Sequence, residues 1–584
     1  MIFFNKIKTT RHIAVWVQTL FALPAIFIGV SSASCQLNEA HASGITISYQ
    51  HSLEKIFRES NLGKTDTLPV IDVAKGEVAS LQYIINGDKD ITDVDVHFNS
   101  NEQNKDILSG ARAYYEGFVR AMIFADKRSR DFLPAHDNEY PDPLYSFPCK
   151  QITANQNQPC WISIPVGANA KTGDYKCSVT FTGKYKGQSF MLTRRFIVKV
   201  YPVVLSKDDI LSVSNWFAFE TPQNEYKKTF KRMNAGADVP YNSELYWGYL
   251  KKYAAIMSAH GQNVFYLSPV HLVTYKRDGN KWGFDFSFFD KVAGTLQANT
   301  KLKFIEGGAL ALRGNGWEGN FRMLFPHQEN GTWGVGLQDL SNPDVQQFYK
   351  AFMPALCAHL KEKGWDKIYI QHIADEPIDA NADSYISISK FIRAQLTCNL
   401  KFIDAVQTTK VAGYVDIWVP QLDFFDKNAA FFENRRRSYN ETVWFYTSAF
   451  PQGNYANRFI ELPLAKVRLL HWINFKYNAS GYLHWGFNFW DDNLLMQHKS
   501  GSDGLPAGDA WIVYPGNNEV LSSIRFETMR DGINDYTLLR MLQKQNAAAA
   551  QVLVNKIVLS YDNYNTDAAT ILAIHKQLLV ALSK

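Results

Sequence analysis

The chain has 584 residues, of which 46% are hydrophobic and 20% charged. These values exclude a disordered protein and leave room for two or more domains. The formal net charge of +5 includes Lys6, Lys8 and Arg11, which precede the first acid, Glu39, so a chain without that segment carries 5 − 3 = +2; a nearly neutral chain without a basic run is not typical of a nucleic-acid-binding protein.

Residues 1–34 are typical of a signal peptide. A basic start precedes an apolar stretch at residues 13–30, which small residues and Cys35 follow. Gln18 and Pro24 disfavour a permanent membrane helix. Cleavage before Cys35 would leave this cysteine for a lipid, whereas Ala40-His41-Ala42 is an alternative cleavage site. We therefore expect an exported protein, in the periplasm or at the cell surface, either soluble or attached to a membrane through Cys35.

Residues 44–205 have the pattern of an antiparallel β-sandwich. Short β-type runs, several with alternating apolar residues, are separated by Gly, Asn, Asp and Pro. These runs are residues 77–87, 94–99, 160–168, 174–183 and 190–204. None of the runs carries a catalytic pattern, so we interpret this domain as an accessory module.

Export would permit disulfides. Cys149 and Cys160 flank a polar loop and are the best candidates for a bridge, while Cys177 alternates with apolar residues and is expected to be a buried thiol. Cys357 and Cys398 lie in or near helical segments. No pair has the spacing of zinc ligands, so we expect neither a metal nor another cofactor.

Residues 206–584 alternate between strand-like runs and amphipathic helices. The strand-like runs are residues 213–219, 264–268, 304–308, 368–377, 402–405, 416–420, 442–447 and 481–490. The helical patterns are residues 244–260, 288–298, 343–364 and 383–397, with further helices after the sixth and seventh runs and from residue 522 onward. Eight such strands predict a (β/α)₈ barrel. An open doubly wound sheet would need a glycine-rich turn after its first strand, and none follows Phe219.

Two adjacent acids, Asp375 and Glu376, end the fourth run and precede Pro377. In such barrels the chemistry lies at the carboxyl ends of the strands. Two neighbouring like charges there are costly unless they have a function, and a structural salt-bridge network is the alternative interpretation. Pro377 favours an extended backbone at Glu376, so we expect a straight strand up to that residue.

Aromatic and amide side chains stand at the ends of the other strands. With no cationic cluster among them, they favour sugar chemistry over phosphate chemistry. The candidates for substrate contact are Trp216, His372, Trp444, Tyr446, Trp485, Asn488 and Trp490. Other interpretations stay open, because Trp485 could fill the barrel, Glu306 could belong to a polar layer inside it, and His372 could anchor a neighbour. The stretch 309–338 reads as a long loop, which in a compact domain is usually functional.

The carboxyl-terminal stretches resemble a known signature. Residues 508–516, 522–527 and 530–536 resemble domain of unknown function 4091. Together with residues 481–490 and Asp375-Glu376-Pro377, they resemble glycoside hydrolase family 123, the β-N-acetylgalactosaminidases. The resemblance implies a β-sandwich followed by a (β/α)₈ barrel, and a glycan substrate with a terminal 2-acetamido sugar.

The resemblance also implies substrate-assisted, retaining catalysis, in which the 2-acetamido oxygen attacks the anomeric carbon. Carried over to this chain, Asp375 orients the acetamido group and Glu376 is the general acid and later the base. We expect Tyr446 to hold the acetamido oxygen, Trp444, Trp485 and Trp490 to stack on the sugar, and Asn488 to contact a hydroxyl group. A charged Asp375 should also keep Glu376 protonated.

Two other functions remain possible at this point. A glycosidase for a different sugar would use a separate carboxylate, such as Glu306, as nucleophile. A non-catalytic surface protein could use the aromatic residues to bind glycans. Four charged residues after the last strand (Arg525, Glu527, Arg530 and Asp531) are expected to form a structural network that holds the barrel closed.

Overall fold

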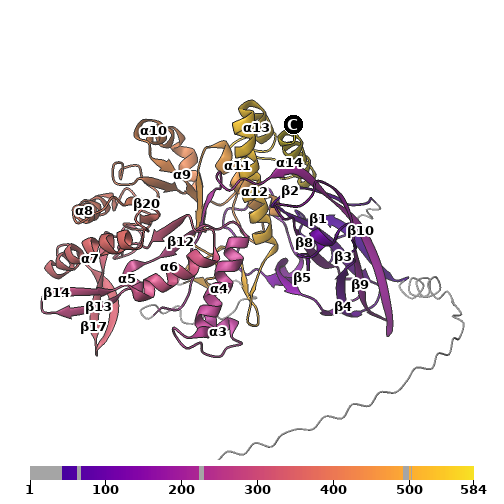
Figure 1. Cartoon of the computed structure of the whole chain (residues 1–584), viewed down its shortest axis with the longest axis horizontal. Helices are drawn as coiled ribbons and strands as arrows, with labels where there is room; N and C mark the ends of the chain where they lie inside the picture. The colour runs from indigo at the N-terminus through magenta and orange to yellow at the C-terminus, as the bar shows by residue number, and fades with distance from the viewer. Residues whose placement is uncertain (1–42, 62–66, 222–228, 491–498, 501–502) are drawn as a thin grey trace, which may run out of the picture.

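The computed structural model describes residues 43–61, 67–221, 229–490, 499–500 and 503–584. The predicted signal peptide and Cys35 lie outside the described residues. A β-sandwich and a barrel lie side by side, and the carboxyl-terminal helices run between them (Figure 1). Among the described helices, none is both long enough and apolar enough to cross a lipid bilayer.

The amino-terminal part is a sandwich of two five-stranded sheets. In spatial order, the first sheet contains β1 (Ile45–His51), β3 (Val78–Gly87), β8 (Gln158–Pro165), β5 (Arg112–Arg120) and β6 (Glu139–Ser146). The second contains β2 (Val70–Lys75), β10 (Gln188–Val204), β9 (Gly173–Tyr185), β4 (Ile91–Phe98) and β7 (Cys149–Ile152). Neighbouring strands are antiparallel except for β2 and β10, which are parallel. The structure thus confirms the predicted sandwich and adds strands β1, β2, β5, β6 and β7 to those expected.

The predicted disulfide between Cys149 and Cys160 is wrong. Cys149 lies at the edge of the second sheet and Cys160 in the first, and both are buried free thiols in the core between the sheets. Cys177 is also free and buried, as expected. The disulfide instead joins Cys357 to Cys398, whose Cα atoms are 5.5 Å apart. The polar loop after Cys149 suggested proximity, but spacing along the chain does not show into which sheet a strand is recruited.

The second part is a closed barrel of eight parallel strands, as predicted. In chain order they are β11 (Ser212–Asn215), β12 (Val264–Leu267), β15 (Phe304–Gly307), β19 (Tyr369–Gln371), β20 (Lys401–Val406), β21 (Ile417–Pro420), the pair β22 (Thr442–Val443) and β23 (Phe445–Tyr446), and β24 (Gly481–His484). The seventh strand is interrupted at Trp444. Its first half pairs with β21 and its second half with β24, which pairs with β11 and closes the barrel.

Helices cover the barrel from outside at the predicted places. They are α4 (Glu244–Ala259), α6 (Ser287–Asn299), α7 (Pro343–Glu362), α8 (Ala382–Arg393), α9 (Leu422–Lys427), α10 (Ala429–Tyr439) and α11 (Leu464–Lys476), followed by α12 (Ile524–Gln545), α13 (Ala547–Asn555) and α14 (Ala568–Leu582). Local signals explain their starts: the Ser243 side chain caps α4, and Asn342 caps α7, which has Pro343 in its first turn.

The stretch 309–338 is not the long loop that we expected. It forms a three-stranded antiparallel sheet of β16 (Ala311–Arg313), β17 (Phe321–Glu329) and β18 (Thr332–Gln338), beside the hairpin of β13 (Thr274–Asp278) and β14 (Lys281–Asp285). Asn330 and Gly331 join β17 to β18 with φ angles of 48° and 80°. An Asn-Gly pair in this conformation is a strong hairpin signal, which the abundance of Gly and Asn in this stretch obscured.

Buried ion pairs join the sandwich to the barrel. Arg525 of α12 donates two hydrogen bonds to Asp142 of β6, and both side chains are fully buried. Glu527 contacts His260, and Arg530 donates to Ser80 of the sandwich. The predicted charged network therefore exists, but it ties the barrel to the sandwich as well as to its own helices.

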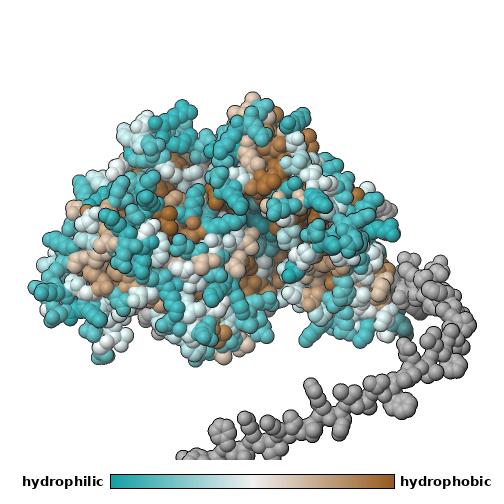
Figure 2. Space-filling view, in the orientation of Figure 1, coloured by the Kyte–Doolittle hydropathy of each residue, from teal (hydrophilic) through white to brown (hydrophobic). Residues whose placement is uncertain are grey.

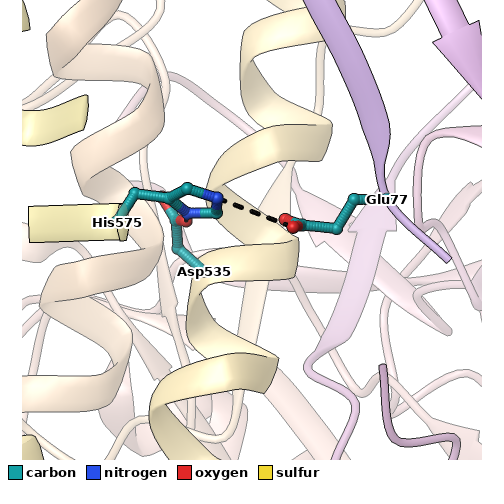
Figure 3. Close-up of side chains that lie close together, drawn as sticks. All are labelled: Glu77, Asp535 and His575. Atoms are coloured by element: carbon teal, nitrogen blue, oxygen red, sulfur yellow. Dashed lines mark hydrogen bonds and ion pairs between the residues drawn. The ribbon is translucent and has the colours of Figure 1, made fainter. Parts of the chain in front are cut away.

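A second buried cluster at this interface contains Glu77, Asp535 and His575 (Figure 3). The three side chains are close enough to share a cation, with ligand atoms within 4.8 Å of one another. However, Asp535 already accepts two hydrogen bonds from the Arg468 guanidinium and one from Trp472. A cation would have to lie against an arginine, so this cluster is an ion-pair network rather than a metal site.

The face of the molecule seen in Figure 2 is mostly hydrophilic, and apolar side chains gather over the carboxyl-terminal helices. The exposed apolar residues here include Val552 on α13, Val580 on α14 and Leu559 in the segment between these helices. Both α13 and α14 pack on α12, and α14 also packs on β2 and β10 of the sandwich. Of these two helices, α14 therefore lies between the two parts of the protein, whereas α13 packs on the neighbouring helices.

Candidate active site

The two acids stand on the segment that follows the fourth barrel strand. Strand β19 ends at Gln371, and the next residues run beside β20, where the Glu376 amide donates to the carbonyl of Ala405 (3.1 Å). The backbone of Glu376 is not extended as expected but left-handed, with φ of 52°. Arg313 donates to the Glu376 carbonyl, so contacts on both sides outweigh the preference that Pro377 imposes. A non-glycine residue in this conformation costs about 1–3 kcal/mol and is typical of functional sites.

The Glu376 side chain belongs to a cluster of polar groups at the carboxyl ends of β20, β21 and β23. Tyr446 donates its hydroxyl proton to Glu376 Oε1, and Gln407 Nε2 lies 3.3 Å from the same oxygen. Gln421 Oε1 accepts a hydrogen bond from Gln407 (3.1 Å) and lies 3.1 Å from the Tyr446 hydroxyl oxygen. Glu376 itself remains partly exposed. Tyr446 was a predicted site residue and lies in this cluster, whereas Gln407 was not predicted.

Asp375 is also partly exposed, and no described residue donates a hydrogen bond to its carboxylate. Burial and the neighbouring Glu376 charge raise the pKa of Asp375 to about 7, against the opposing effects of His372 and Arg313. The hydrogen-bond donors of the site go to Glu376, so nothing of this kind offsets the cost of ionising Asp375.

A fully buried triad of charges lies beneath the acids. His372 contacts Asp404 through Nδ1 (2.8 Å) and Glu306 through Nε2 (2.7 Å). Burial would lower the pKa of His372, but these two hydrogen bonds and charges outweigh it and raise the pKa to about 10. His372 is therefore an imidazolium near neutral pH. Both its ring nitrogens are occupied and its side chain is 1% exposed, so the predicted contact between His372 and substrate is wrong.

Glu306 is fully buried in the same triad. It also accepts hydrogen bonds from Ser214 Oγ (2.5 Å) and Trp216 Nε1 (2.9 Å). The Trp216 ring packs on Tyr266 with centroids 4.6 Å apart, so Trp216 lies at the side of the site. Its only hydrogen-bond donor, the indole N–H, is used on Glu306. A carboxylate that accepts three hydrogen bonds and has no exposed surface cannot reach a sugar. The geometry disfavours the alternative in which Glu306 is the nucleophile.

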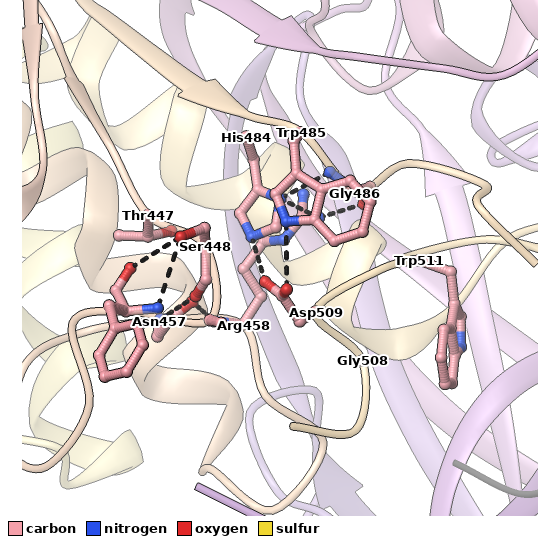
Figure 4. Close-up of polar contacts among 12 residues, drawn as sticks. Thr447, Ser448, Asn457, Arg458, His484, Trp485, Gly486, Gly508, Asp509 and Trp511 are labelled. Carbon is pink, nitrogen blue, oxygen red and sulfur yellow. Dashed lines mark hydrogen bonds and ion pairs between the residues drawn. The ribbon is translucent and has the colours of Figure 1, made fainter. Parts of the chain in front are cut away.

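Trp485 lies on the other side of the acids, after β24. Its indole nitrogen donates to Asp509 Oδ2 (3.1 Å), and His484 lies 3.4 Å from the second oxygen of Asp509 (Figure 4). Burial raises the pKa of Asp509 to about 7; Arg458 and Trp485 oppose this rise, and the charge of Glu376 adds to it. Arg458 in turn donates to His484 (2.8 Å). Trp485 is therefore held in one orientation and is partly exposed near Glu376.

Three predicted contacts lie away from the acids. Trp444 is 1% exposed, one layer deeper in the barrel than Tyr446, and lines a cavity of about 520 Å³ at the opposite, amino-terminal end. The Trp490 indole donates to the Val513 carbonyl in the core. Asn488 exchanges two hydrogen bonds with the backbone of Ala218 and thereby joins two loops. The structure therefore places none of the three beside the acids: Trp444 faces the opposite end of the barrel, and Asn488 and Trp490 follow the last strand, which ends at His484, into the protein.

The comparisons with known proteins agree with this architecture. Residues 54–183 match the model of the glycoside hydrolase 123 N-terminal domain, and residues 238–542 match the model of the glycoside hydrolase 123 catalytic domain. No curated protein sequence matches this chain.

Among solved structures, a family 123 glycoside hydrolase from Clostridium perfringens, analysed for glycolipid glycan hydrolysis, has a TM-score of 0.68 at 15% identity and covers 92% of this chain and 97% of its own. A family 5 glycoside hydrolase from Bacteroides vulgatus has a TM-score of 0.31 at 11% identity, over 58% of this chain and 71% of its own. A family 20 exo-β-N-acetylglucosaminidase from Vibrio harveyi has a TM-score of 0.22 at 10% identity, over 73% and 86%.

The first of these similarities supports the fold, and the family models supply the assignment. The catalytic-domain model alone spans more than half of the chain, and the N-terminal model covers most of the sandwich. The chain therefore belongs to glycoside hydrolase family 123 and is a glycoside hydrolase.

Proposed function

We propose that the protein releases terminal β-linked N-acetylgalactosamine from glycans by substrate-assisted, retaining hydrolysis. The observation that carries the proposal is the pair Asp375–Glu376, two adjacent, partly exposed acids with separate surroundings. Glu376 is held by Tyr446 and Gln407, whereas Asp375 has no hydrogen-bond donor among the described residues. Consecutive Cα atoms are about 3.8 Å apart, so the two carboxyl groups can address two atoms of one sugar.

In the first step, the acetamido carbonyl oxygen of the substrate attacks the anomeric carbon. The bond to the leaving oxygen breaks, its electron pair goes to that oxygen, and Glu376 supplies the proton. Asp375 accepts a hydrogen bond from the acetamido N–H, which gains positive charge as the oxazolinium ring forms. Holding the acetamido group in this position can contribute roughly 7–11 kcal/mol to the barrier reduction.

In the second step, Glu376 takes a proton from water, whose oxygen attacks the anomeric carbon and opens the ring. The cycle needs one carboxylate and one carboxylic acid. Burial and the Glu376 charge raise the pKa of Asp375 to about 7, which favours a state in which one carboxyl group of the pair carries a proton near neutral pH. The proposed first step requires this proton on Glu376 once substrate is bound. Tyr446 now donates to Glu376, so the role that we propose for it, binding the acetamido oxygen, requires its hydrogen bond to change partner.

No protein nucleophile is required in this scheme. The structure offers support here, because Glu306, the carboxylate that the alternative mechanism would use, is fully buried behind three hydrogen bonds. We also propose, from residues 1–35 alone, that the chain is exported and that a lipid on Cys35 can attach it to a membrane.

A panel of three chromogenic substrates tests the proposal: the β-N-acetylgalactosaminide, the β-N-acetylglucosaminide and the β-galactoside, which has a plain 2-hydroxyl group. We expect hydrolysis of the first and none of the third. Glu376→Gln and Asp375→Asn should each lower kcat/KM on the first by about 10²–10⁴-fold, since each removes a group that acts on the reacting atoms. Glu329→Gln is the matched control, because the Glu329 side chain is 81% exposed on β17.

Two outcomes would contradict the scheme. One is efficient hydrolysis of the β-galactoside, which has no acetamido group to take part. The other is a stable covalent adduct between a 2-fluoro sugar and an enzyme carboxylate, detected as a mass increase of the intact protein, because substrate-assisted catalysis forms no bond to the enzyme.

A further inference from the structure

We propose that Trp317 is the platform on which the sugar next to the cleaved bond, the leaving group of the proposed reaction, stacks. The inference rests on the proposed role of Glu376 as general acid. It adds to that role a residue that determines specificity on the aglycone side, on the segment between β16 and β17.

The first observation is the exposure of Trp317. Its side chain is 50% exposed, whereas the large tryptophans Trp161, Trp418 and Trp472 are fully buried. Exposing an indole ring to water is unfavourable, and the apolar face of a sugar ring is a common partner for such a ring. Exposure by itself does not identify a ligand, so the position of the ring and its rigidity matter.

The second observation is that Trp317 is held in place on both its ring and its backbone. The Arg313 guanidinium lies over the indole, 3.9 Å from the ring centroid. The Trp317 carbonyl lies 3.4 Å from Asn381 Nδ2, and Asn381 is fully buried and also accepts a hydrogen bond from the Ile378 amide (2.9 Å). An aromatic side chain that is already ordered loses little conformational entropy when a ligand stacks on it.

The third observation connects this platform to the catalytic acid. The same guanidinium that covers the Trp317 ring donates a hydrogen bond to the carbonyl of Glu376. The amide of Ala311 donates to the Ile373 carbonyl (2.9 Å), so the start of this segment runs beside the loop that carries the acids. A single guanidinium group therefore separates the indole from the backbone of Glu376.

The proposed reaction determines which part of the substrate lies beside Glu376. Glu376 protonates the oxygen of the leaving group, so the leaving group has to be next to Glu376 when the bond breaks. Trp317 and Arg313 lie at the edge of the acid pair, where Arg313 contacts the Glu376 backbone and is close enough to oppose the rise in the pKa of Asp375. They present a flat apolar face and N–H donors there, which is the combination that recognises a sugar through one face of its ring and its hydroxyl groups.

The test compares two substrates that differ only in the leaving group. One is the β-fluoride of the sugar that the wild-type enzyme hydrolyses in the panel above, and the other is the disaccharide in which this sugar is β-linked to galactose. Fluoride has no ring to stack and needs little help from an acid. Trp317→Ala should lower the ratio of kcat/KM for the disaccharide to kcat/KM for the fluoride by about 10- to 50-fold, as expected for a tryptophan at the centre of a contact.

Two further variants sharpen the comparison. Trp317→Phe keeps an aromatic ring and should lower the ratio less than Trp317→Ala. Leu312→Ala is the matched control. Leu312 is 41% exposed and precedes Arg313 on β16, so their side chains point to opposite sides of the strand. This variant should leave the ratio within about twofold.

An unchanged ratio in Trp317→Ala would overturn the inference. An equal loss on both substrates would overturn it too, because it would mean that Trp317 acts only by supporting Arg313 and the backbone of Glu376. A wild-type preference for a sugar without an acetamido group would refute the proposed function, but the ratio for that sugar would still decide whether Trp317 binds the leaving group.

Discussion

At the scale of single residues, the site is organised by where hydrogen-bond donors are placed. Glu376 accepts hydrogen bonds from Tyr446 and Gln407, and His372 bonds to Glu306 and Asp404. No described residue donates a hydrogen bond to the Asp375 carboxylate. A carboxyl group that is largely shielded from water and has no hydrogen-bond donors is expensive to ionise. Although Asp375 is partly exposed, its surroundings in the folded protein favour the protonated form.

This cost predicts that Asp375→Asn stabilises the protein in a pH-dependent way. The folded pKa of about 7 lies above the ordinary value of 3.8, so between these pH values the folded protein keeps a proton that the unfolded chain has lost, and wild-type stability falls as pH rises. Asparagine removes this penalty. After allowance for partial exposure, we expect a gain of about 1–2 kcal/mol at pH 8, or roughly 1–2 °C, and none near pH 4.5.

Thermal melting of both proteins at half-unit steps between pH 4.5 and 8 measures this difference. Glu329→Gln, an exposed substitution of the same type, should show no such trend. An Asp375→Asn protein that is no more stable than the wild type at pH 8 would mean that Asp375 ionises at its ordinary pH.

At the scale of elements, the barrel was predictable and the added strands were not. Strands buried on both sides are continuous apolar runs, as in β21 and β23, so their positions can be read locally. The acids could be named because they follow such a run closely. Gln407 and Arg313 could not, because they lie 31 and 63 residues from Glu376 and nothing in local spacing shows that they meet it.

The disulfide between α7 and the segment after α8 has an effect that can be measured at this scale. It closes a loop with a sequence separation of 41 residues, which restricts the unfolded chain. We expect the double variant Cys357→Ser/Cys398→Ser to lose about 2–4 kcal/mol of unfolding free energy in urea titrations. Adding a reductant should bring the wild type to the stability of the variant and leave the variant unchanged. Equal stability of the oxidised and reduced wild type would contradict this expectation.

At the scale of the whole molecule, the sandwich and the barrel behave as one packed unit in this structure. The Asp142–Arg525 pair crosses their boundary at 2.8–2.9 Å with both side chains fully buried, and Arg525 also donates to the carbonyl of Gly508, next to Asp509 of the site. The sandwich thus supports the segment that orients Trp485. Another pair, Lys576 with Asp72, crosses the same boundary at 3.7 Å, but Lys576 is 51% exposed.

These two pairs predict losses of stability of different size when methionine replaces the cation. Arg525→Met leaves Asp142 buried without its cation, which should cost about 3–5 kcal/mol and lower the melting temperature by roughly 3–4 °C for a chain of this length. Lys576→Met removes a solvent-screened partner and should shift melting by less than about 1 °C. Calorimetric melting of both variants makes the comparison. Similar small shifts would mean that the buried pair contributes little and that apolar packing of α12 and α14 alone joins the two parts.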